Sequence, residues 1–156
     1  MSDILCLIPA RSGSKGLKNK NIKLFNGIPL ILYPYNIAKQ SRFITDIAIT
    51  SDSKKYLNFF KKKNIFKILR PKKISQSKSK IYDVIIHALT KLKKHYEYIV
   101  LLEPTSPLTS VKEIDKAIQI LTSKKNNINS VVSVVFNHKF LSVFKIDLNK
   151  DLRIKN

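Results

Sequence analysis

Short apolar runs that alternate with amphipathic segments are the feature that most constrains the fold of this chain. The runs have the length and β-branched content of buried strands, and they span residues 4–8, 43–50, 66–69, 98–102 and 130–135. Between them, apolar residues recur at helical spacing, which predicts helices over residues 30–40, 53–63, 81–95 and 111–121. Strands and helices that alternate in this way form parallel sheets through right-handed crossovers. The sequence therefore predicts an α/β fold: one domain over residues 1–156, three layers deep, with a mostly parallel sheet and a further strand over residues 140–147.

Charge is the most unusual aspect of the composition. The chain has 30 Lys and Arg residues against 10 Asp and Glu residues, a formal net charge of +20 at pH 7. The lysines are spread along nearly every segment, whereas arginine, the residue preferred for recognition of bases and phosphates, is scarce. No recognition motif or aromatic platform accompanies them. We therefore expect attraction of anionic substrates and no specific nucleic-acid partner, with a basic nucleic-acid-binding module as a remote alternative.

The remaining composition bears on location. The single cysteine, Cys6, lies within the first apolar run and predicts a buried thiol rather than a disulfide framework. No apolar run approaches the length of a membrane span, and the N-terminus lacks the layout of a signal peptide. The sequence predicts a cytoplasmic protein with no membrane partner.

The first apolar run leads directly into a basic loop over residues 8–21. The loop combines two glycines with four cations, in the order Arg11, Gly13, Lys15, Gly16, Lys18 and Lys20. Glycines let backbone N–H groups turn toward an anion, and the cations supply charge where the strand ends. The spacing matches neither the Walker pattern nor the dinucleotide-binding turn. The loop therefore predicts a polyphosphate site of a third kind.

Two further segments follow strands of the predicted sheet. Asp52 comes directly after the second strand, and residues 103–106 come after the fourth. Because ligands in such sheets bind outside the C-terminal ends of the strands, we expect both segments to lie beside the basic loop. For Asp52, capping of the following helix is an equal alternative.

Four ordered segments, with the strand that follows them, resemble the motifs of one family. They are the loop over residues 8–21, the strand and Ser-Asp ending over residues 47–52, the Arg-Pro pair at 70–71 and the Leu-Leu-Glu-Pro-Thr-Ser-Pro-Leu segment at 101–108, followed by the strand at 130–134. In this order they resemble the CMP-sialic acid synthetases, the acylneuraminate cytidylyltransferases. The resemblance implies a Rossmann-like fold of the nucleotide-diphospho-sugar transferase type. It also implies transfer of CMP from CTP to a nonulosonic acid, of the sialic, legionaminic or pseudaminic type, with Mg²⁺ and release of pyrophosphate.

The resemblance assigns residues to the nucleotide. Arg11 and Lys15 would be catalytic and, with Ser14, would hold the phosphates, while Lys20 lies nearby. Asn21 and the main chain near Ala10 would read the cytosine. The residues that would help to position the nucleotide are Arg70 and Ser79.

The sugar and the metal draw on other segments. Glu103, Thr105 and Ser106 are expected to bind the sugar substrate, and Asp52 is the candidate ligand of Mg²⁺. The chain departs from the family pattern where Glu103 replaces a glutamine, Thr109 an arginine and Ser77 an acidic residue.

Family members extend further at the C-terminus and dimerise through a segment beyond the position of Asn156. From the sequence we therefore expect a C-terminally truncated member, with a complementing C-terminal chain as a possible partner. A non-catalytic or incomplete nucleotide-binding fragment is the alternative to an active enzyme.

Overall fold

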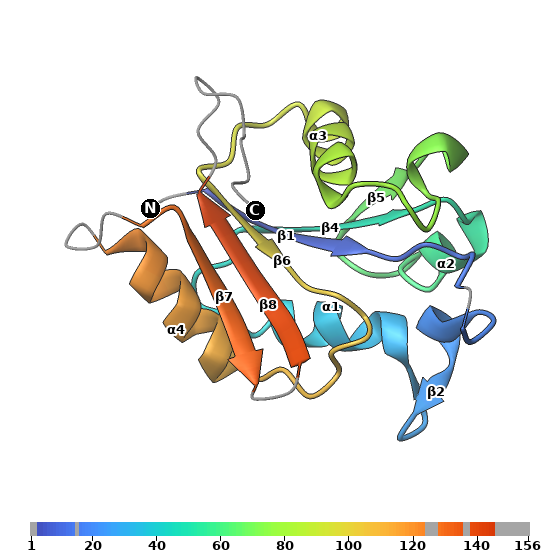
Figure 1. Cartoon of the computed structure of the whole chain (residues 1–156), viewed down its shortest axis with the longest axis horizontal. Helices are drawn as coiled ribbons and strands as arrows, with labels where there is room; N and C mark the ends of the chain where they lie inside the picture. The colour runs from blue at the N-terminus through green and yellow to red at the C-terminus, as the bar shows by residue number, and fades with distance from the viewer. Residues whose placement is uncertain (1–2, 15, 124–127, 136–137, 146–156) are drawn as a thin grey trace.

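The computed structural model describes residues 3–14, 16–123, 128–135 and 138–145. Six strands form the main sheet in the order β5-β4-β1-β6-β8-β7 (Figure 1). Their bounds are β1 Ile4–Pro9, β4 Asp46–Ser51, β5 Phe66–Leu69, β6 Tyr98–Leu101, β7 Ser130–Val135 and β8 His138–Lys145. Strands β5, β4, β1 and β6 are parallel, which confirms the predicted α/β fold with a mostly parallel sheet.

Strand β8 is the exception to the parallel arrangement. It pairs antiparallel with both β6 and β7. The chain passes from β6 through α4, Val111–Thr122, to β7 at the sheet edge, and β8 then folds back into the place between them. The predicted last strand therefore exists, at His138–Lys145 rather than 140–147.

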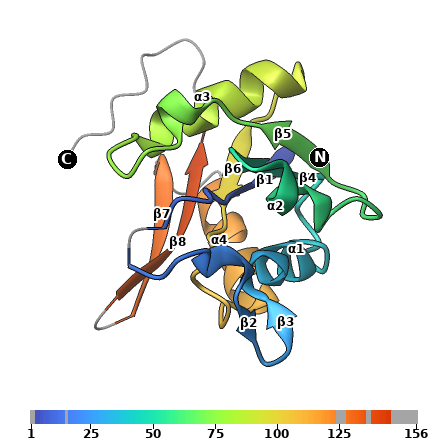
Figure 2. The same cartoon turned by 90° about the vertical axis from the view of Figure 1, so that its right-hand side faces the viewer.

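Helices cover both faces of the sheet and make the predicted three layers (Figures 1 and 2). On one face lie α1, Tyr33–Ala38, α2, Lys54–Asn58, and α4, whose buried side chains form one cluster with alternate residues of β1. On the other face lies α3, Ile81–Leu92, which packs against Leu5, Leu7 and Ile99. Each large apolar side chain removed from water contributes about 1.5–3 kcal/mol, so the two clusters hold the sheet between the helices.

Helices α1 and α3 are shorter than their apolar spacing predicts. The segment expected to open with residue 30 is a 3-10 helix, η2, Leu30–Leu32, and α1 begins only at Tyr33. Pro34 explains this, because it has no N–H to donate to the carbonyl of Leu30. Helix α3 ends at Leu92 rather than 95, because Lys93 adopts the left-handed conformation, with φ of 52°.

Helix α2 keeps its predicted start but loses its end. The Tyr56 N–H donates to the Ser53 hydroxyl at 3.4 Å, so Ser53 is the N-cap. After Asn58 the chain continues through tighter turns, in which Phe60 N–H donates to the carbonyl of Leu57 at 3.0 Å. Ser53, and not Asp52, therefore caps this helix.

A two-stranded hairpin was not predicted. Strands β2, Leu24–Phe25, and β3, Ile28–Pro29, pair antiparallel and project beside α1 (Figure 2). Asn26 and Gly27 join them with φ of 46° and 75°, the positive values that a two-residue turn requires. The Asn-Gly pair is the sequence signal for this hairpin.

Within the described residues, no helix combines the length and apolar content needed to cross a bilayer.

Candidate nucleotide site

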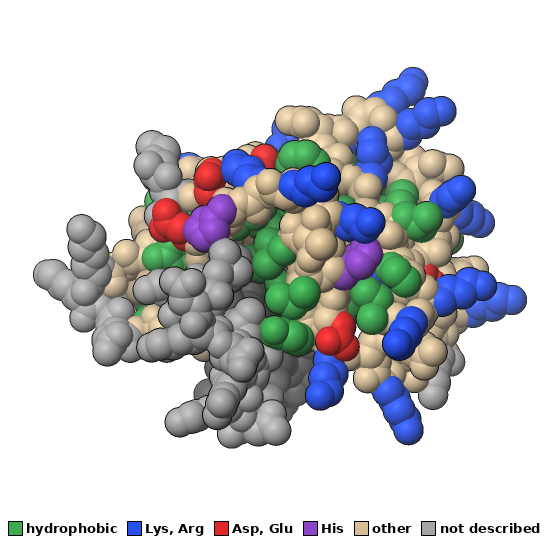
Figure 3. Space-filling view, turned by 90° about the horizontal axis from the view of Figure 1, so that it is seen from above, with side chains coloured by type: hydrophobic (Ala, Val, Ile, Leu, Met, Phe, Trp, Pro, Cys, Tyr) green, Lys and Arg blue, Asp and Glu red, His purple; other side chains and the backbone are tan. Residues whose placement is uncertain are grey.

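An open cavity of about 640 Å³ lies at the C-terminal edge of the sheet. The strands β1, β5 and β6 each deliver a following segment to its wall. Eight residues that the sequence assigns to the site line it: Arg11, Ser14, Lys20, Asn21, Arg70, Ser79, Glu103 and Thr105. Figure 3 shows many Lys and Arg side chains over the half of the molecule toward which β1 and β4 run in Figure 1. The arrangement brings cations from separate strand ends to one hollow.

The loop after β1 is the first wall. Ala10 is buried, and its N–H donates to the carbonyl of Thr50 at 2.9 Å, which extends the sheet pairing by one residue. Arg11 is half-buried and donates from Nη1 to the carbonyl of Gly13 at 2.6 Å. A Cβ added at Gly13 or Gly16 would meet no atom within 4 Å, so open space lies beside the backbone. A ligand can therefore approach the loop closely.

The end of this loop is held by a buried amide. Asn21 is only 6% exposed, and its Nδ2 donates to the carbonyl of Arg11 at 3.0 Å. Asn21 and Lys20 both belong to the 3-10 helix η1, Lys20–Ile22, and both line the cavity. This hydrogen bond thereby joins the two ends of the loop. Lys15, predicted as a phosphate ligand and catalytic residue, lies outside the described residues.

Arg70 supplies a cation from the segment that directly follows β5, the outermost parallel strand. Its N–H donates to the carbonyl of Ser51 at 2.8 Å, and its side chain is buried, with the residue only 5% exposed. Nε donates to the Ser75 hydroxyl at 3.0 Å. Burial lowers the pKa of the Arg70 guanidinium, while the nearby Asp52 carboxylate raises it and Arg11 lowers it further. Arg70 is therefore a fixed cation of the wall rather than a surface arginine.

The segment after Arg70 forms a further part of the cavity wall. It contains the 3-10 helix η3, Lys72–Ile74, and lines the cavity through residues 74–77 and Ser79. The Ser79 hydroxyl accepts from the Gln76 N–H at 2.9 Å, and the Ser75 hydroxyl donates to the carbonyl of Pro71 at 2.9 Å. Ser75 is one of the site residues that sequence reasoning missed, because serines are frequent in this polar stretch and the sequence alone does not show which one faces Arg70.

The segment after β6 divides between two hollows. Glu103 is exposed on the wall of the main cavity, and the Thr105 hydroxyl donates to its carboxylate at 3.3 Å. Ser106 instead lines a smaller hollow beside Pro34 and Thr109, where its hydroxyl is buried without a partner among the described residues. The structure thus places Thr105 beside the other site residues and Ser106 apart from them.

Asp52 lies at the end of β4 beside the cavity residues rather than among them. Its two carboxylate oxygens accept from the Ser12 N–H and the Ser12 hydroxyl, each at 2.8 Å. Among the described residues, no group of three or more His, Cys, Asp or Glu side chains is placed to hold a metal ion. Asp52 as a metal ligand stays a prediction.

Comparison with known proteins agrees with this arrangement. The chain is 30% identical over 158 residues to an N-acylneuraminate cytidylyltransferase of Escherichia coli O18:K1:H7, covering 94% of this chain and 38% of that protein. It is 34% identical over 137 residues to a CMP-N,N'-diacetyllegionaminic acid synthase of Legionella pneumophila, covering 84% of this chain and 57% of that protein. The chain thus spans roughly a third to somewhat over half of the length of these relatives.

The fold has solved counterparts as well. A CMP:2-keto-3-deoxy-manno-octonic acid synthetase in complex with CTP matches with a TM-score of 0.72 and 14% identity, over 92% of this chain and 74% of that one. A sequence profile described as cytidylyltransferase matches residues 5–156. Since the profile spans nearly all of the sequence, including every strand end that builds the cavity, the chain belongs to the cytidylyltransferase family.

Proposed function

We propose that this chain transfers CMP from CTP to a nonulosonic acid of the sialic, legionaminic or pseudaminic type and releases pyrophosphate. The observation that carries the proposal is the meeting of Arg11, Lys20 and Arg70 around one cavity at the C-terminal edge of the sheet. The names of the relatives, which specify acylneuraminate and diacetyllegionaminic acid, support the class of sugar. Their cytidylyl chemistry supports CTP as the donor.

The chemistry explains why cations dominate the wall. The anomeric oxygen of the sugar bonds to the α-phosphorus of CTP as its hydroxyl proton passes to solvent, the bond from that phosphorus to the bridging oxygen breaks, and pyrophosphate leaves. Negative charge grows on the phosphate oxygens as the leaving group departs. Arg11 and Lys20 would offset it from the loop, with Lys15 as a further predicted cation, and Arg70 from the opposite wall. We therefore assign these residues to the phosphates.

Asn21 is our candidate for reading the base. Its amide is buried and held by the carbonyl of Arg11, so it presents a fixed hydrogen-bonding edge to the cavity. The buried main chain at Ala10 lies directly before this carbonyl. A fixed amide distinguishes the donor and acceptor pattern of cytosine from that of uracil, because a mismatched polar group is left unpaired. Ser79 and Thr105 would complete the contacts of the nucleotide and the sugar.

We infer that Mg²⁺ accompanies the nucleotide. The donor set fits this ion, because Glu103 is an exposed carboxylate on the cavity wall and Mg²⁺ takes one or two carboxylates together with phosphate oxygens. When bound, the ion would neutralise charge on the phosphates. Glu103 would then serve the metal and the sugar side of the site together, which gives its carboxylate a use that a neutral amide lacks.

Location and assembly complete the proposal. We place the reaction in the cytoplasm and expect a partner chain, either a second copy, as in the family that the motifs resemble, or a complementing C-terminal chain. Sedimentation velocity tests assembly, and a monomer at all concentrations contradicts it.

Calorimetric titration of CTP, UTP, ATP and GTP in Mg²⁺ tests the donor. We expect CTP to bind in preference to the other three, and equal or absent binding contradicts the proposal. Pyrophosphate release with a panel of nonulosonic acids then tests turnover. Tight CTP binding without pyrophosphate release would favour the non-catalytic nucleotide-binding alternative.

A further inference from the structure

A carboxylate beside a polyphosphate site needs a physical reason, because it repels the ligand. Burial lowers the pKa of Arg70, and the Asp52 carboxylate partly offsets this; burial raises the pKa of Tyr56, and Asp52 adds to it, so Asp52 lies near both residues. Like charges near an anion cost binding free energy. Asp52 must therefore favour CTP binding by more free energy than the repulsion from its own charge costs.

The contacts of Asp52 show how it can favour binding, because they fix the loop. Both of its oxygens are engaged by Ser12, one by the N–H and one by the hydroxyl, at 2.8 Å each. Hydrogen bonds to an ionised carboxylate are about twice as strong as those between neutral groups. Asp52 and Ser12 are 40 residues apart in sequence, so this pair fixes the loop to the strand β4 rather than to its own neighbours.

Neither helix capping nor metal binding explains the position of Asp52. Ser53 caps α2, so Asp52 is not needed there. A metal ion at Asp52 would compete with two short hydrogen bonds from Ser12. Four residues along, in helix α2, the Tyr56 hydroxyl donates to Asn19 Oδ1 at 3.4 Å, so the helix that follows Asp52 also contacts the far end of the loop.

We propose that Asp52 is a positioning residue that presets loop residues 11–14 and 16–19 for the phosphates of CTP by holding Ser12, and that it is not a ligand of Mg²⁺. The inference rests on the proposed function for the identity of the ligand. The loop geometry itself does not depend on it. With the loop already fixed, less conformational entropy is lost when the nucleotide binds.

Three variants separate this role from the alternatives. Asp52→Asn keeps the size of the side chain and removes the charge, and Ser12→Ala removes the hydroxyl donor while the N–H remains. Asp46→Asn is the matched control, because Asp46 begins the same strand and also accepts two hydrogen bonds, but at the N-terminal end of the strand. Thermal melts report the fold of each variant.

The first readout is CTP affinity at several Mg²⁺ concentrations. We expect Asp52→Asn to weaken CTP binding about 10-fold to 100-fold, the loss typical of a hydrogen-bonded charge, and Ser12→Ala to weaken it in the same direction. The double variant should lose less than the product of the two, because the residues act as a pair. The Mg²⁺ concentration for half-maximal binding should stay unchanged. A higher Mg²⁺ requirement in Asp52→Asn alone, or an effect no larger than that of Asp46→Asn, overturns the proposal.

The second readout needs no nucleotide. Amide hydrogen exchange at Ser12 should be about 10-fold or more faster in Asp52→Asn than in the wild-type chain, and unchanged in Asp46→Asn. Equal exchange at Ser12 in all three chains overturns the proposal. If the wild-type chain binds no CTP while Ser12 exchange responds to Asp52→Asn, the proposed function fails and the anchoring of the loop is upheld.

Discussion

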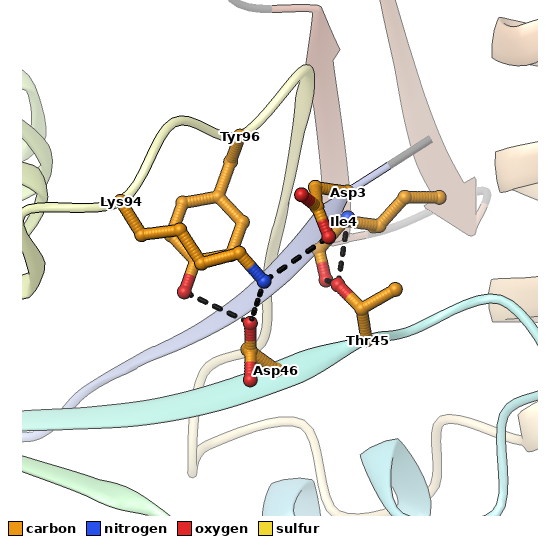
Figure 4. Close-up of polar contacts among 6 residues, drawn as sticks. All are labelled: Asp3, Ile4, Thr45, Asp46, Lys94 and Tyr96. Carbon is orange, nitrogen blue, oxygen red and sulfur yellow. Dashed lines mark hydrogen bonds and ion pairs between the residues drawn. The ribbon is translucent and has the colours of Figure 1, made fainter. Parts of the chain in front are cut away.

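Two aspartates lie at the two ends of β4, and they differ in whether their hydrogen-bond partners are charged. At the N-terminal edge, Asp46 accepts from Lys94 Nζ at 2.7 Å and from the Tyr96 hydroxyl at 3.0 Å, and Lys94 also reaches Asp3 at 3.1 Å (Figure 4). The charges of Lys94, Asp3 and Asp46 offset one another there. At the C-terminal edge, Asp52 accepts from an uncharged partner, Ser12, and forms no ion pair with a cation of the described residues.

The difference shows how one strand serves stability at one end and binding at the other. In the described part of the chain, no ion pair joins Arg11, Lys20 or Arg70 to an acidic side chain. A closed network such as that of Lys94 lowers the energy of the empty protein, whereas a set of unpaired cations lowers it only when an anion arrives. The comparison predicts that substitutions at the two edges will separate binding from folding.

The largest effect is expected at the C-terminal edge. Arg11→Ala removes a half-buried cation from the cavity wall and should lower the rate of CMP transfer about 10²-fold to 10³-fold, the usual cost of one oriented electrostatic group. Pyrophosphate release measures it. Lys23→Ala is the matched control, because Lys23 is an exposed lysine just beyond η1 and does not line the cavity. Equal losses in the two variants would mean that general positive charge, and not the cavity, carries the effect.

A smaller effect of the opposite kind is expected at the N-terminal edge. Tyr96→Phe removes the buried donor to Asp46 and should lower the free energy of unfolding by about 1–2 kcal/mol, while CTP affinity stays unchanged. Urea unfolding and calorimetry measure the two quantities. A change in CTP affinity without a change in stability would remove the distinction between the edges.

The same tyrosine predicts a modest dependence on alkaline pH. Burial, and then the hydrogen bond to Asp46, raise the pKa of Tyr96 from 10.0 to about 12. The folded protein therefore keeps a proton that the unfolded chain releases, so stability is full below pH 10 and falls as pH rises toward 12. Unfolding free energies at pH 9, 10 and 11 should fall more steeply for the wild-type chain than for Tyr96→Phe. Parallel slopes would show that Tyr96 does not titrate differently in the two states.

Much of the fold could be predicted from local pattern. Strand β5 lies where its apolar run places it, and the core face of α4, with Ile114 and Ile118, follows helical spacing. The order of the strands could not be predicted in the same way. Nothing in the apolar pattern distinguishes a β8 that inserts antiparallel between β6 and β7 from one added at the edge, because that choice depends on tertiary packing rather than on local sequence.

The candidate site was likewise predictable only in part. The loop cations and Arg70 were predictable because each follows a strand, and strand ends meet at one edge. The partners that fix them were not, because the Asp52–Ser12 and Arg70–Ser75 pairs depend on side-chain directions set by tertiary structure. Family membership itself was predictable, since the four motifs are short, ordered and local.

The central claim is that the C-terminal edge binds CTP and the N-terminal edge does not. Backbone amide chemical shifts during a CTP titration in Mg²⁺ test it most directly, because each residue other than proline reports separately. The account predicts saturable shifts at Arg11, Asn21 and Arg70, with Asp46 and Tyr96 unmoved. Shifts that centre on Asp46 and Tyr96, or that spread evenly over the lysine-rich surface without saturating, would contradict it.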